Sequence, residues 1–369
     1  MNVTAEYTAK HARLIDLLDE TGADGIELSS TGALSWLLGG ARVHISLAGA
    51  PILRVVAHRE GLDIAVFSNE AERIASEELG ELTEVPEIRI HELAWHHNMN
   101  DLASWLPTSL PTVVNESQVP HELRKARAPL MEAEVSRYRS LCQDAATALT
   151  DVLHEVTPQT TEREVAAALA PRLISAGADP VVLLVNGVSR AQHRHPLPTD
   201  AAIGERAMAV VCARRAGLIA NVTRWVRFGE PSAAEQNLDA AIQEVEADVF
   251  DSLVPGTRLE SVLDVLKTSY GRHGFSSEEW TRHHQGGAAG YEGRDPRVSP
   301  GIPDSISANQ AFAWNPSAFS ADLGIGLKVE DTVLLRADDS QDVIEVLTTD
   351  ERWPTAEVRG RRRPLVLQR

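Results

Sequence analysis

The stretch that decides the fold covers residues 193–229 and reads HRHPLPTDAAIGERAMAVVCARRAGLIANVTRWVRFG. A histidine-rich turn comes first, and two apolar runs follow at residues 207–213 and 218–226, joined by a short link that contains Gly217. Apolar runs rich in valine and isoleucine on either side of such a link are typical of a β-hairpin. Because successive side chains of a strand point to opposite faces, the hairpin is expected to present alternate residues to one side.

Composition restricts the class of protein. The chain has 369 residues, enough for two domains, and 43% of them are hydrophobic, so a large core can be buried. The formal net charge of −18 argues against a general binder of nucleic acid or of anionic membranes, since both require a basic face. Three features favour a cytoplasmic location. The two cysteines are far apart in the sequence, there is no apolar leader, and no apolar run approaches the roughly 18 residues of a membrane span.

Helix and strand patterns alternate along the chain, which predicts an α/β (α+β) fold. Short strands are expected at residues 25–28, 43–48, 52–57 and 64–68, with helices at 11–20 and 70–79. Later helices are expected at residues 129–154, 161–177, 235–253 and 259–270, and later strands at 181–185, 311–316 and 328–335. We place the boundary between two domains near residue 123, giving domains 1–123 and 124–369. His91, Trp95, His96 and His97 form a cluster that either binds a metal or lies in a solvated loop.

The order of these motifs resembles the creatinase and Xaa-Pro aminopeptidase family, which has the pita-bread fold. Pro198-Thr199-Asp200 before the hairpin, Gly217 and Thr223-Arg224 within it, and the WLxGxR-like residues 36–42 near the N-terminus carry the resemblance. The resemblance implies a small creatinase-like α/β domain at the N-terminus, followed by a pita-bread domain. It also implies that the functional pocket lies beside the hairpin.

Metal-dependent members of that family bind two divalent ions through two aspartates, a histidine and two glutamates. Carried over by local motif, these ligand positions are Val210, Asn221, Gly287, Asn315 and Glu330. One carboxylate remains among the five, whereas hard dications require an oxygen-rich, negatively charged cage. The expectation is therefore that the protein binds no metal and needs no cofactor.

Polar side chains nevertheless remain in the four segments that line the family's pocket, and they are costly to bury without a purpose. The resemblance to creatinase, which cleaves a C–N bond without metal through a histidine, makes His195 the preferred acid–base group. An ungapped count from the hairpin selects His193 instead. His284 and Glu330 complete the expected catalytic set, with the carboxylate of Glu330 expected to favour the charged form of His195. Candidate substrate-binding residues are His193, Arg224, Lys328, Asn315, Arg294, Tyr291 and His283.

Three functions remain open from the sequence. The first is a metal-independent enzyme that hydrolyses or otherwise cleaves a C–N bond in a small amino-acid-like molecule. The second is an inactive pita-bread protein that binds a small molecule or a protein partner, and the third is a metal-dependent Xaa-Pro aminopeptidase. Cys212 in the hairpin is either a core residue or a nucleophile. The resemblance also implies a homodimer, in which Arg42 and His44 would reach the partner's pocket.

Overall fold

The computed structural model describes residues 3–106, 110–337 and 342–369, and the chain forms two compact units. The first unit comprises residues 1–133 with the tip of the hairpin at 216–218, and the second comprises 134–215 and 219–369. The predicted boundary near residue 123 falls within helix α4 (Pro120–Arg127). Among the described residues, no helix combines the length and the apolar character needed to cross a membrane.

The first unit is a five-stranded sheet with helices, as the alternating pattern predicts. Its strands are β1 (Gly25–Leu28), β2 (Leu53–His58), β3 (Gly61–Phe67), β4 (Ile88–Leu93) and β5 (Val113–Asn115), in the order β4-β3-β2-β1-β5. Its helices are α1 (Val3–Thr21), α2 (Thr31–Leu37), the short α3 (Ala71–Arg73), which continues as a π-helical segment (Ile74–Leu79), and α4. The strand predicted at residues 43–48 is wrong, because this segment is irregular and exposes Ile45 and Leu47 to solvent.

His91 has a structural role in this first unit. Its Nε2 lies 2.6 Å from Oδ1 of Asp63, and the same buried carboxylate accepts hydrogen bonds from Arg89 and contacts His58. Burial alone would raise the pKa of Asp63, but these partners lower it far below its usual range. The charges in this cluster are therefore satisfied within the protein.

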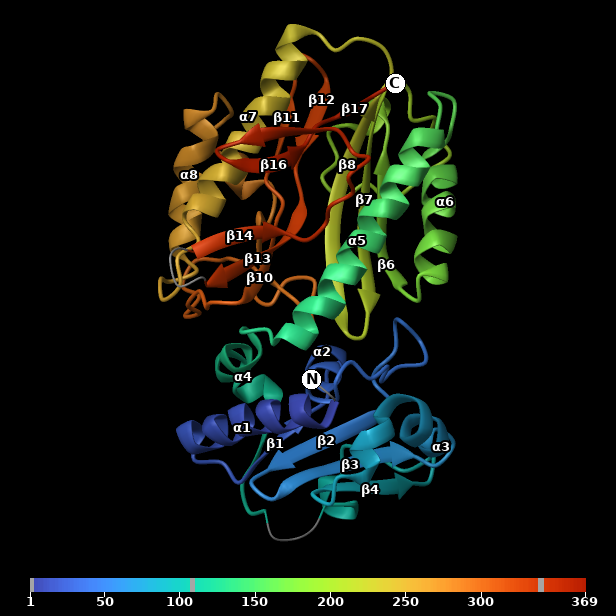
Figure 1. The fold of residues 1–369 in the computed structure, drawn as a ribbon, viewed down its shortest axis with the longest axis vertical. Helices are drawn as coiled ribbons and strands as arrows, with labels where there is room; N and C mark the ends of the chain where they lie inside the picture. Colours follow the sequence, from blue (N-terminus) through green and yellow to red (C-terminus); the bar gives the residue numbers. More distant parts are fainter. Residues whose placement is uncertain (1–2, 107–109, 338–341) are drawn as a thin grey trace. The chain divides into compact units, whose positions relative to one another are not determined.

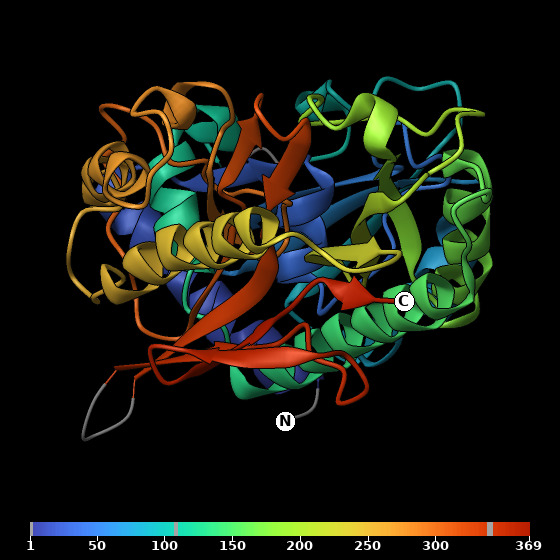
Figure 2. The same cartoon turned by 90° about the horizontal axis from the view of Figure 1, so that it is seen from above.

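The second unit contains the hairpin. Its helices are α5 (Glu132–Glu155), α6 (Glu162–Ser175), α7 (Ala233–Asp251) and α8 (Ser261–Arg272). Its strands are β6 (Asp179–Asn186), β7 (Arg206–Arg215), β8 (Leu218–Arg227), β9 (Gly286–Ala289), β10 (Gln310–Trp314), β11 (Ser317–Ser320), β12 (Ile325–Lys328), β13 (Asp331–Ala337), β14 (Asp342–Val346), β15 (Thr355–Val358), β16 (Arg361–Pro364) and β17 (Leu367–Gln368). Helices α5 and α6 form one pair and α7 and α8 another, with strands between the two pairs (Figures 1 and 2).

Two four-stranded sheets form the centre of this unit. One has the order β17-β8-β7-β6 and contains the predicted hairpin as β7 and β8, and the other has the order β14-β13-β10-β9. The sheets approach each other where Thr223 of β8 forms an antiparallel bridge with Glu330, immediately before β13. Apolar side chains of α7 and α8 pack with Phe312 and Trp314 of β10 to form the main core. This core holds the second sheet rigidly beside the hairpin.

Candidate functional site

A cavity of about 610 Å³ lies beside the hairpin, as the resemblance implies. It is of ordinary size for a small-molecule site. Strand β6 and the following turn contribute one wall, β7 and β8 contribute another, and the loop after β9 and the segment around β12 complete it. The lining residues are Val181, Val182, Leu183, Leu184, His195, Leu197, Val210, Cys212, Asn221, His284, Glu292, Gly293, Arg294, Arg297, Asn315, Lys328 and Glu330.

Glu330 is buried in this cavity and fully engaged. Its carboxylate accepts hydrogen bonds from Thr223 at 2.7 Å, from Arg294 at 2.7 Å and from the amide of Asn315 at 3.1 Å. The ammonium of Lys328 lies 3.6 Å away. Burial alone would raise the pKa of Glu330, but Lys328, Arg294 and the hydrogen bonds lower it to about 2. The carboxylate is thus ionised, and the protein itself supplies its counter-charges.

Three histidines form a cluster at the same site. The Nε2 atoms of His195 and His283 lie 3.1 Å apart, and the ring of His284 is centred 5.5 Å from that of His195. The backbone N–H of Gln285 donates to Nδ1 of His283 at 3.3 Å. In a neutral imidazole one nitrogen accepts and the other donates, so Nε2 of His283 carries the proton and donates it to His195. This arrangement makes Nε2 of His195 the hydrogen-bond acceptor of the pair and places the hydrogen of His195 on Nδ1.

The surroundings keep all three imidazoles neutral. Burial, together with nearby cations, lowers the pKa of His283 far below its usual range and that of His284 to about 3. Burial and Lys328 also lower the pKa of His195, although Glu330 acts in the opposite direction. The expected influence of Glu330 on His195 therefore exists, but burial and Lys328 outweigh it. A neutral imidazole is the form that can accept a proton.

The family's two-ion site does not fit these residues. Val210 has no ligand atom, and the side-chain amide nitrogen of Asn221 donates to the carbonyl of Ile219 at 3.0 Å. Gly287 has a φ of 152°, and a Cβ atom there would lie 2.2 Å from the carbonyl oxygen of Pro296, so an imidazole at this position would require the backbone to move. At the remaining positions, Asn315 is neutral and Glu330 is already neutralised by cations.

One other arrangement of possible ligands exists within the described ranges. His195, His283 and His284 bring ligand nitrogens within 4.8 Å of one another. The cations that lower their pKa values, among them Lys328 and Arg294, would also repel a dication. In addition, Nδ1 of His283 accepts a hydrogen bond, whereas a metal-bound imidazole usually donates from its second nitrogen. The surroundings of the cluster suit a neutral hydrogen-bonded group better than a metal.

The structure brings six of the predicted site residues to the cavity wall and a seventh, His283, into contact with one of them. His195, His284, Glu330, Lys328, Asn315 and Arg294 line it, and His283 contacts His195. The local Pro-Thr-Asp motif therefore selected the histidine that faces the cavity, whereas His193 lines a separate, smaller one.

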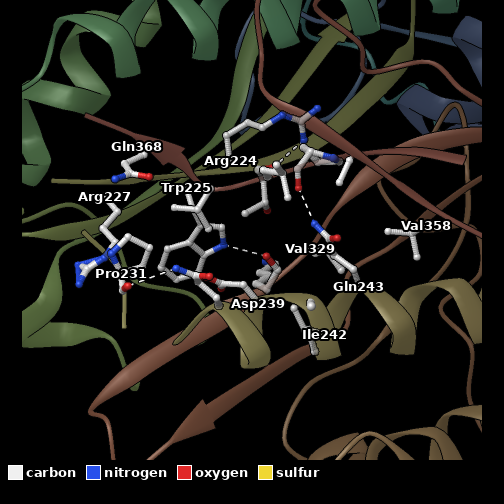
Figure 3. Close-up of a pocket in the computed structure, with 18 of the residues that line it drawn as sticks. Arg224, Trp225, Arg227, Pro231, Asp239, Ile242, Gln243, Val329, Val358 and Gln368 are labelled. Atoms are coloured by element: carbon white, nitrogen blue, oxygen red, sulfur yellow. Dashed lines mark hydrogen bonds between the residues drawn. The ribbon is translucent and has the colours of Figure 1, made fainter. Parts of the chain in front are cut away.

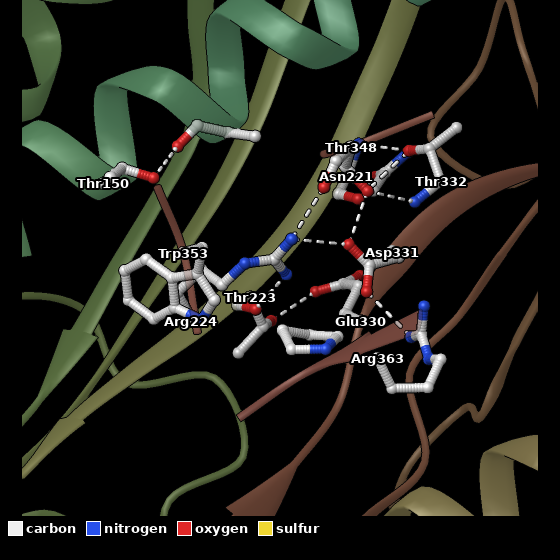
Figure 4. Close-up of polar contacts among 12 residues, drawn as sticks. Thr150, Asn221, Thr223, Arg224, Glu330, Asp331, Thr332, Thr348, Trp353 and Arg363 are labelled. Carbon is white, nitrogen blue, oxygen red and sulfur yellow. Dashed lines mark hydrogen bonds and ion pairs between the residues drawn. The ribbon is translucent and has the colours of Figure 1, made fainter. Parts of the chain in front are cut away.

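Arg224 and Tyr291 have other partners and do not line the cavity. The guanidinium of Arg224 is buried and donates to Asp331 at 2.9 Å and to the carbonyl of Thr348 at 2.7 Å (Figure 4). The hydroxyl of Tyr291 donates to Glu134 at 2.6 Å. Both therefore connect segments within the second unit, and the expectation that they bind substrate is corrected.

Sequence reasoning missed Arg297 and did not settle the role of Cys212. Arg297 lines the cavity and is exposed, and its position in the loop after β9 could have suggested it. Burial, with a smaller effect from Glu330, raises the pKa of Cys212 to about 12. A thiol with that pKa is protonated at neutral pH, so Cys212 does not provide a nucleophile.

A second cavity of about 540 Å³ lies farther along β8, beside α7 (Figure 3). Several of its polar side chains already have partners within the protein. Arg227 pairs with Glu235 at 3.0 Å, and the amide of Gln243 donates to the carbonyl of Pro364 at 2.6 Å. The indole N–H of Trp225 donates to the carbonyl of Lys328 at 2.8 Å. The cavity beside His195 offers more groups suited to chemistry.

Comparison with known proteins identifies the family. Residues 136–337 match the model of metallopeptidase family M24. An Xaa-Pro dipeptidase from Pyrococcus horikoshii is 22% identical over 224 residues, which are 59% of this chain and 63% of that dipeptidase.

Solved structures share the fold across nearly the whole chain. The prolidase from Pyrococcus horikoshii OT3 has a TM-score of 0.74 at 19% identity and covers 93% of this chain and 99% of its own. The dipeptidase PepE from Mycobacterium ulcerans has a TM-score of 0.75 at 18% identity, with 99% of each chain covered. The N-terminal domain of the FACT complex subunit SPT16 from Cicer arietinum has a TM-score of 0.68 at 13% identity, covering 94% of this chain and 97% of its own. These matches confirm the predicted creatinase-like and pita-bread architecture, and the chain belongs to metallopeptidase family M24.

Proposed function

We propose that this protein hydrolyses a C–N bond in a small amino-acid-like molecule and does so without the pair of metal ions typical of the resembled enzymes. The observation that carries the proposal is that cations of the protein neutralise Glu330. Its carboxylate accepts a hydrogen bond from Arg294 and lies 3.6 Å from the ammonium of Lys328. Cations of the protein occupy the surroundings where metal ions would be needed. A neutral histidine cluster lies beside them and can move protons.

His195 is the proton-transfer group in this proposal. Its imidazole lines the cavity, its lowered pKa keeps it neutral at pH 7, and its acceptor nitrogen is Nε2, which lies 3.1 Å from Nε2 of His283. A histidine in this state can remove a proton from water, which is the role of a general base. The N–H of His283 orients this nitrogen in the resting protein, and the reacting water must take the place of that N–H before Nε2 can accept its proton.

The proposed reaction needs only water as a second reactant. His195 accepts a proton from water while the water oxygen bonds to the carbonyl or amidine carbon of the substrate. The C–N bond then breaks, and the protonated His195 returns the proton to the departing nitrogen. The positive charges of Lys328 and Arg294 would stabilise the negative charge that develops on the substrate oxygen. His284, held neutral beside His195, provides a further hydrogen-bonding group.

The proposal is tested by a turnover screen of small amides, ureas and N-substituted amino acids, with wild-type protein and His195→Ala compared. A compound that is hydrolysed by the wild type and not by the variant is the expected result. If turnover survives unchanged in His195→Ala, then the assignment of His195 is refuted. If no compound is cleaved but one binds tightly, the protein is a binding member of the family instead.

A further inference from the structure

We infer that the cavity beside His195 selects amino acids whose nitrogen is acylated or carbamoylated, and that it discriminates against free amino acids and dipeptides with a charged ammonium group. This inference rests on the location of the proposed function and adds the class of ligand. Two features of the cavity carry it: an unpaired buried acceptor on Asn315 and an excess of positive charge.

Asn315 offers a hydrogen-bond acceptor that the protein does not use. The residue is 2% exposed, and its side-chain nitrogen donates to Oε1 of Glu330 at 3.1 Å. The carboxylate fixes the orientation of the amide, because a carboxylate oxygen accepts and only the NH₂ group can donate to it. The opposite atom, Oδ1, is buried and has no hydrogen-bond partner within the described residues. Buried polar atoms are nearly always paired, so a ligand N–H is the group this oxygen lacks.

The charges around Asn315 indicate that this N–H belongs to a neutral group. Lys328, Arg294 and Arg297 line the cavity against two carboxylates, Glu330 and Glu292. Glu330 is already bound by Arg294 and lies near Lys328, so it has little attraction left for a ligand cation. Glu292 also has an interaction within the protein, so an ammonium group would enter a positively charged surrounding in which both carboxylates are already engaged. An amide or ureido N–H can donate the same hydrogen bond without that repulsion.

The excess of cations also identifies the group at the other end of the ligand. Arg297 is exposed, lines the cavity and forms no ion pair with any residue the structure describes. Its charge reaches the histidines, because it contributes to the lowered pKa of both His195 and His284. A guanidinium with free N–H groups suits a carboxylate, which it can bind through two hydrogen bonds. Arg297 is therefore the residue assigned to the carboxylate of the amino acid.

Strand β6 provides an apolar surface for the rest of the ligand. Val181 to Leu184 line the cavity, together with Leu197 and Val210. Aliphatic side chains on the ligand would be removed from water against this surface. An N-acyl derivative of leucine combines all the required parts: a carboxylate, a neutral N–H and an aliphatic group.

The test compares three probes by isothermal titration calorimetry of the full-length protein: N-acetyl-L-leucine, L-leucine, and N-(3-methylbutyl)acetamide, which lacks the carboxylate. N-acetyl-L-leucine is expected to bind at least about tenfold more tightly than either of the others, a difference of about 1.4 kcal/mol. Equal or tighter binding of L-leucine would overturn the inference, as would an absence of binding by all three probes. Chromatography of the samples after titration reports hydrolysis separately, so a ligand that binds without being cleaved supports the inference while counting against the proposed hydrolysis.

Two variants test the assigned residues. Asn315→Asp keeps the size of the side chain and adds a negative charge, so it is expected to reverse the preference toward L-leucine. Arg297→Gln, at an exposed position, is expected to reduce the affinity for N-acetyl-L-leucine to that of N-(3-methylbutyl)acetamide. Arg362→Gln removes the same charge from the exposed β15–β16 hairpin and serves as the control that should change nothing. An unchanged preference in folded Asn315→Asp or unchanged affinity in Arg297→Gln would refute the assignment.

Discussion

The sharpest prediction concerns metal content. Purified protein dialysed against Mn²⁺ or Zn²⁺ and then against buffer is expected to retain no stoichiometric ion. The reason lies in Glu330, whose carboxylate is held by Arg294 at 2.7 Å and approached by Lys328 at 3.6 Å. An ion that bound this carboxylate would have to remain close to both cations or displace them from a buried site.

The size of that obstacle can be estimated from Coulomb's law. A dication and a unit positive charge about 5 Å apart repel each other by about 7 kcal/mol at an effective dielectric constant of about 20. The carboxylate would attract a bound ion over a shorter distance of about 2–2.5 Å. To do so it would have to give up its hydrogen bonds from Arg294 and Asn315, and each cation that stayed nearby would still oppose the ion by that amount. A second ion would meet the same cations, and the other four ligand positions offer it no carboxylate, since they hold Val210, Asn221, Gly287 and Asn315.

Elemental analysis by mass spectrometry measures the outcome directly, with Glu330→Gln and His283→Ala as comparison variants. Two ions per chain in the wild type, lost in Glu330→Gln, would show that a two-ion centre forms in spite of the cations and would refute the reasoning. One ion per chain, lost in His283→Ala, would place a metal among the three histidines and would equally contradict a metal-independent protein.

Four further predictions concern His195, Lys328, Arg363 and the oligomeric state. His195→Ala should reduce turnover by about 10²- to 10⁴-fold, and His193→Ala should have a smaller effect on turnover. The free energy of unfolding in urea should change by only about 1 kcal/mol in His195→Ala, because this variant removes one hydrogen bond at an exposed residue. Lys328→Ala should weaken the binding of a carboxylate substrate and, because Lys328 lowers the pKa of His195, should move the acidic limb of the pH–rate profile to higher pH. Arg363→Met should destabilise the fold by about 3–5 kcal/mol in urea unfolding, because it leaves two buried carboxylates without their shared cation. We also propose a homodimer, and light scattering that gives a monomer mass at micromolar concentration would contradict it.

The fold could be predicted from the sequence because its patterns are local and repeated. Strands β7 and β8 form where the apolar runs 207–213 and 218–226 predict them, on either side of the link at Gly217. Helix α6 begins at the predicted capping box of Thr161 and Glu164. A strand is wrongly predicted at residues 43–48 because the apolar residues Val43, Ile45 and Leu47 occupy alternate positions, as in a half-buried strand. In the structure Val43 is buried while Ile45 and Leu47 are exposed, and no described strand pairs with the segment. An alternating pattern of apolar residues does not show whether a neighbouring strand is present to pair with the segment.

The site was harder to predict because its contacts join distant residues. The motif at residues 198–200 located His195, since the turn and the hairpin are close in sequence. The hydrogen-bond partners of Arg224 are Asp331 and Thr348, which lie 107 and 124 residues away in the sequence. No local sequence pattern predicts contacts between residues so far apart. Arg297 was missed for a related reason: its importance comes from an absence of partners in three dimensions, which the sequence does not display.

The substitutions at the ligand positions can be understood as one connected change. When a carboxylate such as Glu330 remains buried without metal ions, it needs other positive partners, and here Arg294 and Lys328 provide them. Those partners bring one more positive charge than Glu330 can balance, and Arg297 adds another, against one further carboxylate of the cavity, Glu292. The same cations keep the histidines neutral, which leaves His195 able to accept a proton and makes a bound carboxylate the natural counter-charge. The neutral amide of Asn315 completes the change, because an additional carboxylate there would cancel the positive charge that an anionic ligand requires.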